Sequence, residues 1–183
     1  MRRTAVVVLA PAADPVVGRW RDRHDPHAAA GVPAHVTVLY PWIPAADLTA
    51  EDERALGAIA AGQDRFSLDL TGFGEFDRTL WLAPTPAEPV RALTRAVAAR
   101  WPQHPPYGGR FDGDRPHLTI ADGIDPSLFP PIIADLGPRL PLRVEVTALT
   151  LVEQRTDGTW RLVRDFPLRD AEAARSRAVR AGG

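Results

Sequence analysis

Hydrophobic and polar residues alternate along several short segments of the chain, as they do in β-strands that have one face on a core. Residues 66–70 and 142–146 both show this period of two, and the Asp-Gly pair at 157–158 between apolar runs is typical of a tight hairpin turn. Apolar residues between Val90 and Trp101 instead recur every three or four positions, which predicts a helix with one apolar face. The apolar run Ala5–Ala10 is shorter than the ~7–15 residues typical of a signal-peptide core, so we interpret it as a buried strand.

Several helix starts are marked by residues that cap N-termini. Asp14 and Asp125 each precede a proline, which is favoured at the first helical position. Thr49 and Thr85 each precede an acidic residue by three positions, which is the spacing of a capping box. We therefore expect a helix to begin at each of these places.

The predicted elements follow an order that repeats along the chain. Helices are expected at 14–22, 50–61, 86–100 and 125–136, and strands at 4–10, 35–40, 66–72, 79–83, 116–122, 142–152 and 159–166. Each half has a strand with a His-x-Thr motif, then a helix, then two strands around a turn. This duplication predicts an α+β fold class with two pseudo-symmetric lobes, each an antiparallel sheet with helices. We expect one bilobal domain over residues 1–168, followed by an Ala/Arg-rich tail at 169–183 that frays because it has little to bury.

The two His-x-Thr motifs place an imidazole and a hydroxyl on the same face of a strand. The segments PAHVTVLYPW and RPHLTIADG contain His35 with Thr37 and His117 with Thr119. Residues i and i+2 of a strand point to one face, roughly 6.6 Å apart, so each strand has a polar face opposite an apolar one. Polar faces related by a pseudo-twofold would meet across a central groove. By the same alternation, Tyr40 is expected to face the core.

These residues have a structural interpretation as well as a functional one. A single histidine in a strand is more often a hydrogen-bonded structural residue, and threonine is common in strands. The matched placement in both halves, each with Pro33 or Pro116 within two residues before the histidine, favours a shared function.

Composition narrows the chemistry that is available. The chain has no cysteine, and all 22 basic residues are arginine, so thiol nucleophiles, thiolate metal sites and catalytic lysines are excluded. The formal net charge of −1 predicts no strong attraction of the whole molecule to nucleic acid or membrane. No apolar stretch approaches the length of a membrane span, and we expect a cytoplasmic protein.

The doubled motif, His35-Val36-Thr37 and His117-Leu118-Thr119 in a duplicated α+β layout, resembles that of the 2H phosphoesterase superfamily, and more narrowly its bacterial 2'-5' RNA ligase-like branch. The resemblance covers residues 1 to about 168. It implies a bilobal fold with both motifs lining a central groove, and phosphoester chemistry without a metal or other cofactor. The implied substrates are 2',3'-cyclic phosphates or 2'-5' linkages at an RNA 3' end or in a small cyclic nucleotide. We further expect a monomer with no obligate protein partner and no membrane contact.

The chemistry of the motif residues agrees with this resemblance. Hydrolysis of a cyclic phosphodiester needs a base to activate water and an acid to protonate the leaving oxygen, and histidine suits both roles near neutral pH. We predict His35 and His117 as this pair, with either one as the acid, and Thr37 and Thr119 as hydrogen-bond donors to the phosphate. Arg115 shares the strand face of His117 and could add a charged phosphate contact, although a solvated strand end explains it equally well.

Other functions remain open at this point. The same histidines could carry out reversible 2'-5' ligation, and a non-catalytic module that binds RNA ends or nucleotides could retain the fold. A metal-dependent hydrolase could use His24, His27 and His35, but Pro26 interrupts any helix that would orient the first two, so a loop is the favoured interpretation. Tyr107 and Phe111, in the loop before the second motif, could stack on a base or simply anchor the loop.

Overall fold

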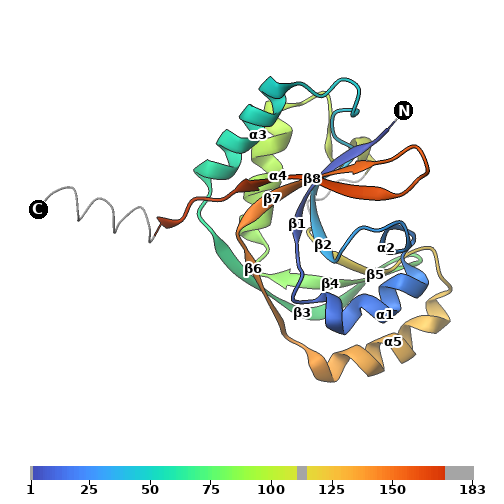
Figure 1. Cartoon of the computed structure of the whole chain (residues 1–183). Coiled ribbons are helices and arrows are strands. Elements are labelled where there is room, and N and C mark those ends of the chain that lie inside the picture. Colours follow the sequence, from blue (N-terminus) through green and yellow to red (C-terminus); the bar gives the residue numbers. More distant parts are fainter. Residues whose placement is uncertain (1, 111–114, 172–183) are drawn as a thin grey trace, which may run out of the picture.

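The computed structural model describes residues 2–110 and 115–171 (Figure 1). The helices are α1 (Asp14–His24), α2 (Pro26–Ala29), α3 (Ala50–Gly62), α4 (Glu88–Arg100) and α5 (Phe129–Leu136), with short 3-10 helices at Pro106–Gly109, Pro126–Leu128 and Gly137–Arg139. The strands are β1 (Thr4–Leu9), β2 (His35–Leu39), β3 (Phe66–Phe76), β4 (Thr79–Thr85), β5 (Leu118–Ala121), β6 (Leu142–Val146), β7 (Ala148–Gln154) and β8 (Trp160–Pro167). The predicted order of elements is therefore present.

Two four-stranded antiparallel sheets confirm the predicted α+β class. We call the sheet β2-β1-β7-β8 the first lobe and the sheet β5-β4-β3-β6 the second lobe. The predicted strand 142–152 is in fact two strands that separate at Thr147, β6 in the second lobe and β7 in the first. Each sheet therefore takes strands from both halves of the sequence, because β3 of the first half also lies in the second lobe.

The pairing of β3 with β6 relates the two halves. Phe66 lies opposite Val146 and Leu70 opposite Leu142, with Leu68 opposite Val144 in the middle of the pairing. Leu68, Leu70, Val144 and Val146 are all buried. The two halves of the sequence are thus joined by a pair of strands, one from each half, whose facing apolar side chains are buried.

One apolar core runs through both lobes. It includes Val36 and Val38 of β2, Leu118 and Ile120 of β5, and the apolar faces of the helices. Figure 1 shows α1 with α5 on one side of the sheets and α3 with α4 on another. Because the apolar faces of both motif strands are buried in this core, their polar faces turn the other way, as predicted.

Two of the expected helix caps are present and two are not. The Thr49 side chain and Asp52 form the capping box of α3, and the Asp125 carboxylate accepts the Ser127 N–H bond at 2.9 Å. Asp14 is instead the first residue of α1, and its carboxylate accepts a 2.9 Å hydrogen bond from the Ala34 N–H, next to the first motif. The Thr85-Pro86 peptide is cis and α4 begins at Glu88, so the predicted capping box at Thr85 is wrong.

The end of the described chain is tied to the loop before β3. The Arg169 N–H donates to the Gln63 carbonyl at 2.8 Å, and the Arg65 N–H donates to the Arg169 carbonyl at 3.0 Å. These bonds hold the first residue of the segment predicted to fray, whereas 172–183 lie outside the described residues. Within the ranges that the structure describes, no helix is long and apolar enough to cross a bilayer.

Arg21 is a buried cation at the junction of the lobes. Its side chain is 2% exposed and donates hydrogen bonds to the Asp25 carboxylate at 2.8 Å and the Thr119 carbonyl at 3.1 Å. A further bond at 3.3 Å reaches the Val32 carbonyl, just before β2. A buried charge is tolerated only when it is paired and hydrogen-bonded, and here that pairing joins α1 to both motif strands.

Replacing Arg21→Leu should therefore lower the free energy of unfolding by about 3–5 kcal/mol, because it removes the buried cation that is paired with the Asp25 carboxylate. The exposed Arg23→Leu on the same helix should change it by no more than about 0.5 kcal/mol. Urea denaturation measures both. The double variant Arg21→Leu/Asp25→Leu removes the unpaired charge and should recover part of the loss. If Arg21→Leu lowered the free energy of unfolding by less than about 1 kcal/mol, the proposed role of Arg21 in joining α1 to both motif strands would be contradicted.

Candidate active site

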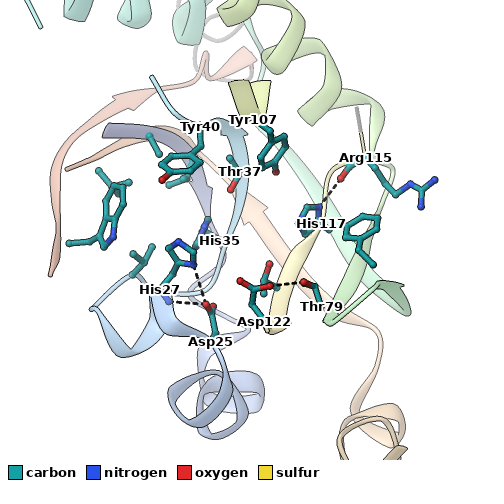
Figure 2. Close-up of a pocket in the computed structure, with 17 residues that line it drawn as sticks. Asp25, His27, His35, Thr37, Tyr40, Thr79, Tyr107, Arg115, His117 and Asp122 are labelled. Atoms are coloured by element: carbon teal, nitrogen blue, oxygen red, sulfur yellow. Dashed lines mark hydrogen bonds and ion pairs between the residues drawn. The ribbon is translucent and has the colours of Figure 1, made fainter. Parts of the chain in front are cut away.

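Both motifs line one cavity of about 650 Å³ between the lobes. His35 and Thr37 come from β2, His117 immediately precedes β5, and Thr119 lies within it. Figure 2 shows His35 and His117 on opposite walls of this cavity. The structure thus brings together the four residues that the sequence selected, and their roles in catalysis stay a prediction.

The two histidines are oriented in the same way. His35 Nδ1 lies 2.8 Å from the Pro33 carbonyl oxygen, and His117 Nδ1 lies 2.8 Å from the Arg115 carbonyl oxygen. A carbonyl can only accept, so in each ring Nδ1 carries the proton and donates it. In the neutral ring this leaves Nε2 with a free lone pair. Each histidine therefore has one nitrogen fixed by the backbone and the other available for proton transfer.

Burial disfavours the charged form of both rings. It lowers the pKa of His35 to about 4, against the smaller opposing effect of the Pro33 carbonyl. Burial also lowers the pKa of His117 below its ordinary value of 6.5, with the Arg115 carbonyl opposing it. At neutral pH both rings of the free protein are mainly uncharged, and His35 is the harder of the two to protonate.

A β-bulge follows the threonine of each motif and turns two further side chains into the cavity. Along β1 and β2, Val7 pairs with Thr37 but Val6 pairs with Leu39, so Val38 is the extra residue. Leu39 is consequently buried in the core and Tyr40 lines the cavity, which corrects the expectation that Tyr40 faces the core. Alternation predicts the wrong face there because it assumes an unbroken ladder.

The second motif has a bulge at the equivalent position. Trp81 pairs with Thr119 and Leu80 with Ala121, so Ile120 is the extra residue and Asp122 lines the cavity. The Asp122 carboxylate accepts a 2.6 Å hydrogen bond from the Thr79 hydroxyl. Tyr40 and Asp122 each lie five residues after a motif histidine, and this correspondence is the sequence feature that could have located both.

Asp25 and His27 form a second titratable pair in the cavity (Figure 2). His27 Nδ1 lies 3.4 Å from the Asp25 carboxylate, which also accepts the His27 backbone N–H at 2.9 Å. Hydrogen bonding to Asp25 raises the pKa of His27, against desolvation. The sequence predicted a loop ahead of the first motif. Instead, Asp25 caps the short helix α2, and His27 on this helix lines the cavity.

The remaining expected residues have varied positions. Arg115 is among the residues that line the cavity, and its guanidinium lies over the Phe76 ring, 5.5 Å from the ring centroid. Tyr107 lines the cavity beside Tyr40, and its backbone N–H donates to the Tyr40 carbonyl at 2.6 Å. Phe111 lies outside the described residues.

The metal site considered from the sequence is not assembled. His24 stacks on Trp20, with ring centroids 5.9 Å apart, and is not among the residues that line the cavity with His27 and His35. Across residues 2–110 and 115–171, no three His, Asp or Glu side chains are grouped to hold a metal ion.

Comparison with protein-family models identifies the superfamily of the chain. Residues 9–158, which include both motifs, match the model of the 2'-5' RNA ligase superfamily. The chain belongs to this superfamily. A comparison with curated proteins found no match.

Solved structures with the same fold support the architecture. The chain is 21% identical to TT0787 of Thermus thermophilus, with a TM-score of 0.60 over 92% of this chain and 99% of that one. It is 21% identical to Escherichia coli LigT complexed with NADP+, with a TM-score of 0.58 over 92% and 98% of the two chains. It is 22% identical to Escherichia coli LigT complexed with 3'-AMP, with a TM-score of 0.53 over 91% of this chain and 98% of that one. At these identities the likeness concerns the fold, which is that of the 2H phosphoesterases of this superfamily.

The histidines of this superfamily member should titrate in a defined order. In NMR titrations of the ring resonances, His35 should show a pKa of about 4, His117 a value below 6.5, and His27 a value above 6.5. The physical reasons are burial of the first two rings and the hydrogen bond of His27 to Asp25. His→Gln variants assign each signal. A His35 resonance that titrates near 6.5 would show that the ring is not desolvated.

Proposed function

We propose that the chain is a metal-independent phosphodiesterase that hydrolyses 2',3'-cyclic phosphates, at RNA ends or in small nucleotides, by acid–base catalysis with His35 and His117. The observation that carries the proposal is the matched Nδ1–carbonyl bonding of the two histidines, which face one cavity from opposite walls. Two facing imidazoles with free Nε2 atoms suit in-line displacement, in which base and acid act on opposite sides of phosphorus. The complex of the related LigT with 3'-AMP supports a nucleotide as the ligand class.

In the proposed reaction, His35 is the base and His117 the acid. The His35 Nε2 takes a proton from water as the water oxygen bonds to phosphorus. The bond from phosphorus to one ribose oxygen breaks, and the protonated His117 gives its Nε2 proton to that oxygen. This assignment follows from burial, because the ring with the lower pKa stays unprotonated when the pair holds one proton.

Other cavity residues would stabilise charge as the reaction proceeds. The Thr37 and Thr119 hydroxyls lie on the same strand faces as the histidines and can donate to the non-bridging phosphate oxygens. Protonated His27, held by Asp25, adds a positive charge near His35. Arg115 would need another side-chain rotamer to reach the phosphate, since its guanidinium lies over Phe76.

Turnover of a nucleoside 2',3'-cyclic phosphate in the presence of EDTA tests the proposal. His35→Ala and His117→Ala should each lower kcat by about 10²–10⁴-fold, the usual contribution of a general acid or base, and leave the circular dichroism spectrum unchanged. His24→Ala, outside the cavity, is the matched control and should retain wild-type kcat. Activity lost on chelation and restored by a divalent ion would overturn the mechanism. Binding of the nucleotide without turnover would favour the non-catalytic module.

The pH dependence of kcat/KM should be bell-shaped, with both limbs below pH 6.5. Below about pH 4 His35 becomes protonated and the base is lost, and above the lowered pKa of His117 the acid loses its proton. In the complex, the negative phosphodiester raises the pKa of both rings, so the kcat profile should lie at higher pH than the kcat/KM profile. Steady-state kinetics from pH 3.5 to 8.5 measure both. An alkaline limb of kcat/KM above 6.5 would contradict the assignment of a desolvated His117.

A further inference from the structure

Three histidines of the described chain line the cavity, and in each of them the Nδ1 atom faces an oxygen atom. For His35 and His117 that oxygen belongs to a neutral backbone carbonyl, 2.8 Å away in both cases. For His27 it belongs to the Asp25 carboxylate, 3.4 Å away. A carboxylate stabilises the protonated imidazole by its negative charge, which a neutral carbonyl lacks. The third ring is therefore placed to carry a positive charge beside two rings that are not.

The short helix α2 holds His27 at the cavity. Asp25 caps this helix and accepts a 2.9 Å hydrogen bond from the His27 backbone N–H. The Asp25 side chain is 1% exposed, whereas the His27 side chain is 50% exposed. Figure 2 shows His27 on the same wall of the cavity as His35, across from His117. A buried carboxylate thus holds the Nδ1 side of an accessible ring, whose Nε2 is left for a ligand.

The other charged groups at the cavity balance one another. The buried Arg21 donates to the Asp25 carboxylate at 2.8 Å and so cancels its charge. Asp122 and Arg115, which both line the cavity, have opposite charges. The two motif histidines are mainly uncharged at neutral pH because they are buried. Among the described residues that line the cavity, His27 therefore decides whether the net charge is positive.

We propose that His27 is the cation that holds the phosphate of the substrate: its Nε2–H donates to a non-bridging phosphate oxygen, and the cavity binds this anion tightly only while the ring is protonated; this rests on the proposed function. A phosphodiester has one negative charge, and the two carboxylates that line the cavity would repel it unless a cation faced it. The chain has no lysine to supply that cation. A hydrogen bond from an imidazolium to a phosphate oxygen is roughly twice as strong as one between neutral groups.

The surroundings of His27 determine the pH at which it loses its proton. Hydrogen bonding to Asp25 raises the pKa of His27 above 6.5, against desolvation. The charged and titratable groups around the ring are Asp25 at the cap of α2, Arg21 of α1, Arg3 before β1, His35 of β2 and Asp122 after β5. A raised pKa means that the ring is charged at pH 6.5 and loses its charge as the pH rises through the raised value. The affinity for an anion should therefore be highest at acid pH and fall as the pH rises.

Isothermal titration calorimetry with cytidine 2',3'-cyclic phosphate tests this role, because the charge of this ligand is constant between about pH 5.5 and 9. The background variant His35→Ala/His117→Ala removes turnover and leaves His27 as the imidazole among the described lining residues. His35→Gln/His117→Gln replaces this background if it does not fold. The affinity should fall by about tenfold from the lower pH to the higher, the loss expected for one charged hydrogen bond. A fall of less than about threefold would overturn the proposal.

Substitutions of His27 in the same background assign the pH dependence. His27→Gln should bind about tenfold more weakly at pH 5.5 and show no further loss at pH 9, because its side chain has no charge to lose. His27→Arg is charged at both pH values and should bind equally well, within about threefold, at both. His24→Gln is the matched control, since His24 stacks on Trp20 outside the cavity, and it should retain both the affinity and its pH dependence. If His27→Gln kept the tenfold fall with pH, the proposal would be overturned, because a residue with only a structural role leaves that fall in place.

Turnover distinguishes this inference from the function on which it rests. If the nucleotide binds with a pH dependence that His27→Gln removes, but the wild-type protein does not hydrolyse it, the enzyme proposal fails and the role of His27 stands. If the wild-type protein hydrolyses it but the affinity does not depend on His27, the enzyme proposal stands and the role of His27 is refuted.

Discussion

The buried contact of Arg21 with Asp25 and two backbone carbonyls is the constraint on which the site depends. A guanidinium that is 2% exposed must keep all its partners, and these partners lie in different parts of the fold. Through Thr119 it contacts the second motif strand, and through Val32 the entrance to the first. The Asp25 that neutralises it also orients His27. One buried cation therefore fixes the relative position of the two motifs and the charge beside them.

The second organising feature is a pseudo-symmetry that holds at the two motifs and is broken on the strands beside them. Both motifs have the same Nδ1–carbonyl bond and the same bulge after the threonine, so the two histidines are presented to the cavity alike. The neighbouring strands differ at the positions opposite Thr37 and Thr119. Val7 lies opposite the first threonine and the much larger Trp81 opposite the second, and there the symmetry ends. A symmetric pair of histidines suits a reaction in which two oxygens exchange on phosphorus, whereas unequal flanks suit a substrate with one large group.

Much of this architecture could be predicted from the sequence because it depends on short-range periodicity. Alternation placed His35 with Thr37 and His117 with Thr119 on polar faces, and duplication placed the two faces together. The prediction failed for Tyr40, since a bulge at Val38 reverses the parity and nothing in the local composition marks a bulge. It also missed the break at Thr147, where two strands of different sheets continue one apolar pattern. Asp14 was misjudged as a helix cap for a related reason, because its partner, the Ala34 N–H, is brought to it by the tertiary fold.

The neighbours of His35 and His117 determine how easily each ring carries a charge. Leu9 and Val7 flank the first motif in the neighbouring strand. Burial against these apolar side chains removes part of the solvation that a charged imidazole would need. His117 is desolvated differently, by the aromatic rings of Phe76 and Trp81 that contact it. Burial thus lowers the pKa of both histidines, although different side chains surround the two rings. The side chains on the neighbouring strands therefore influence how readily each histidine is protonated.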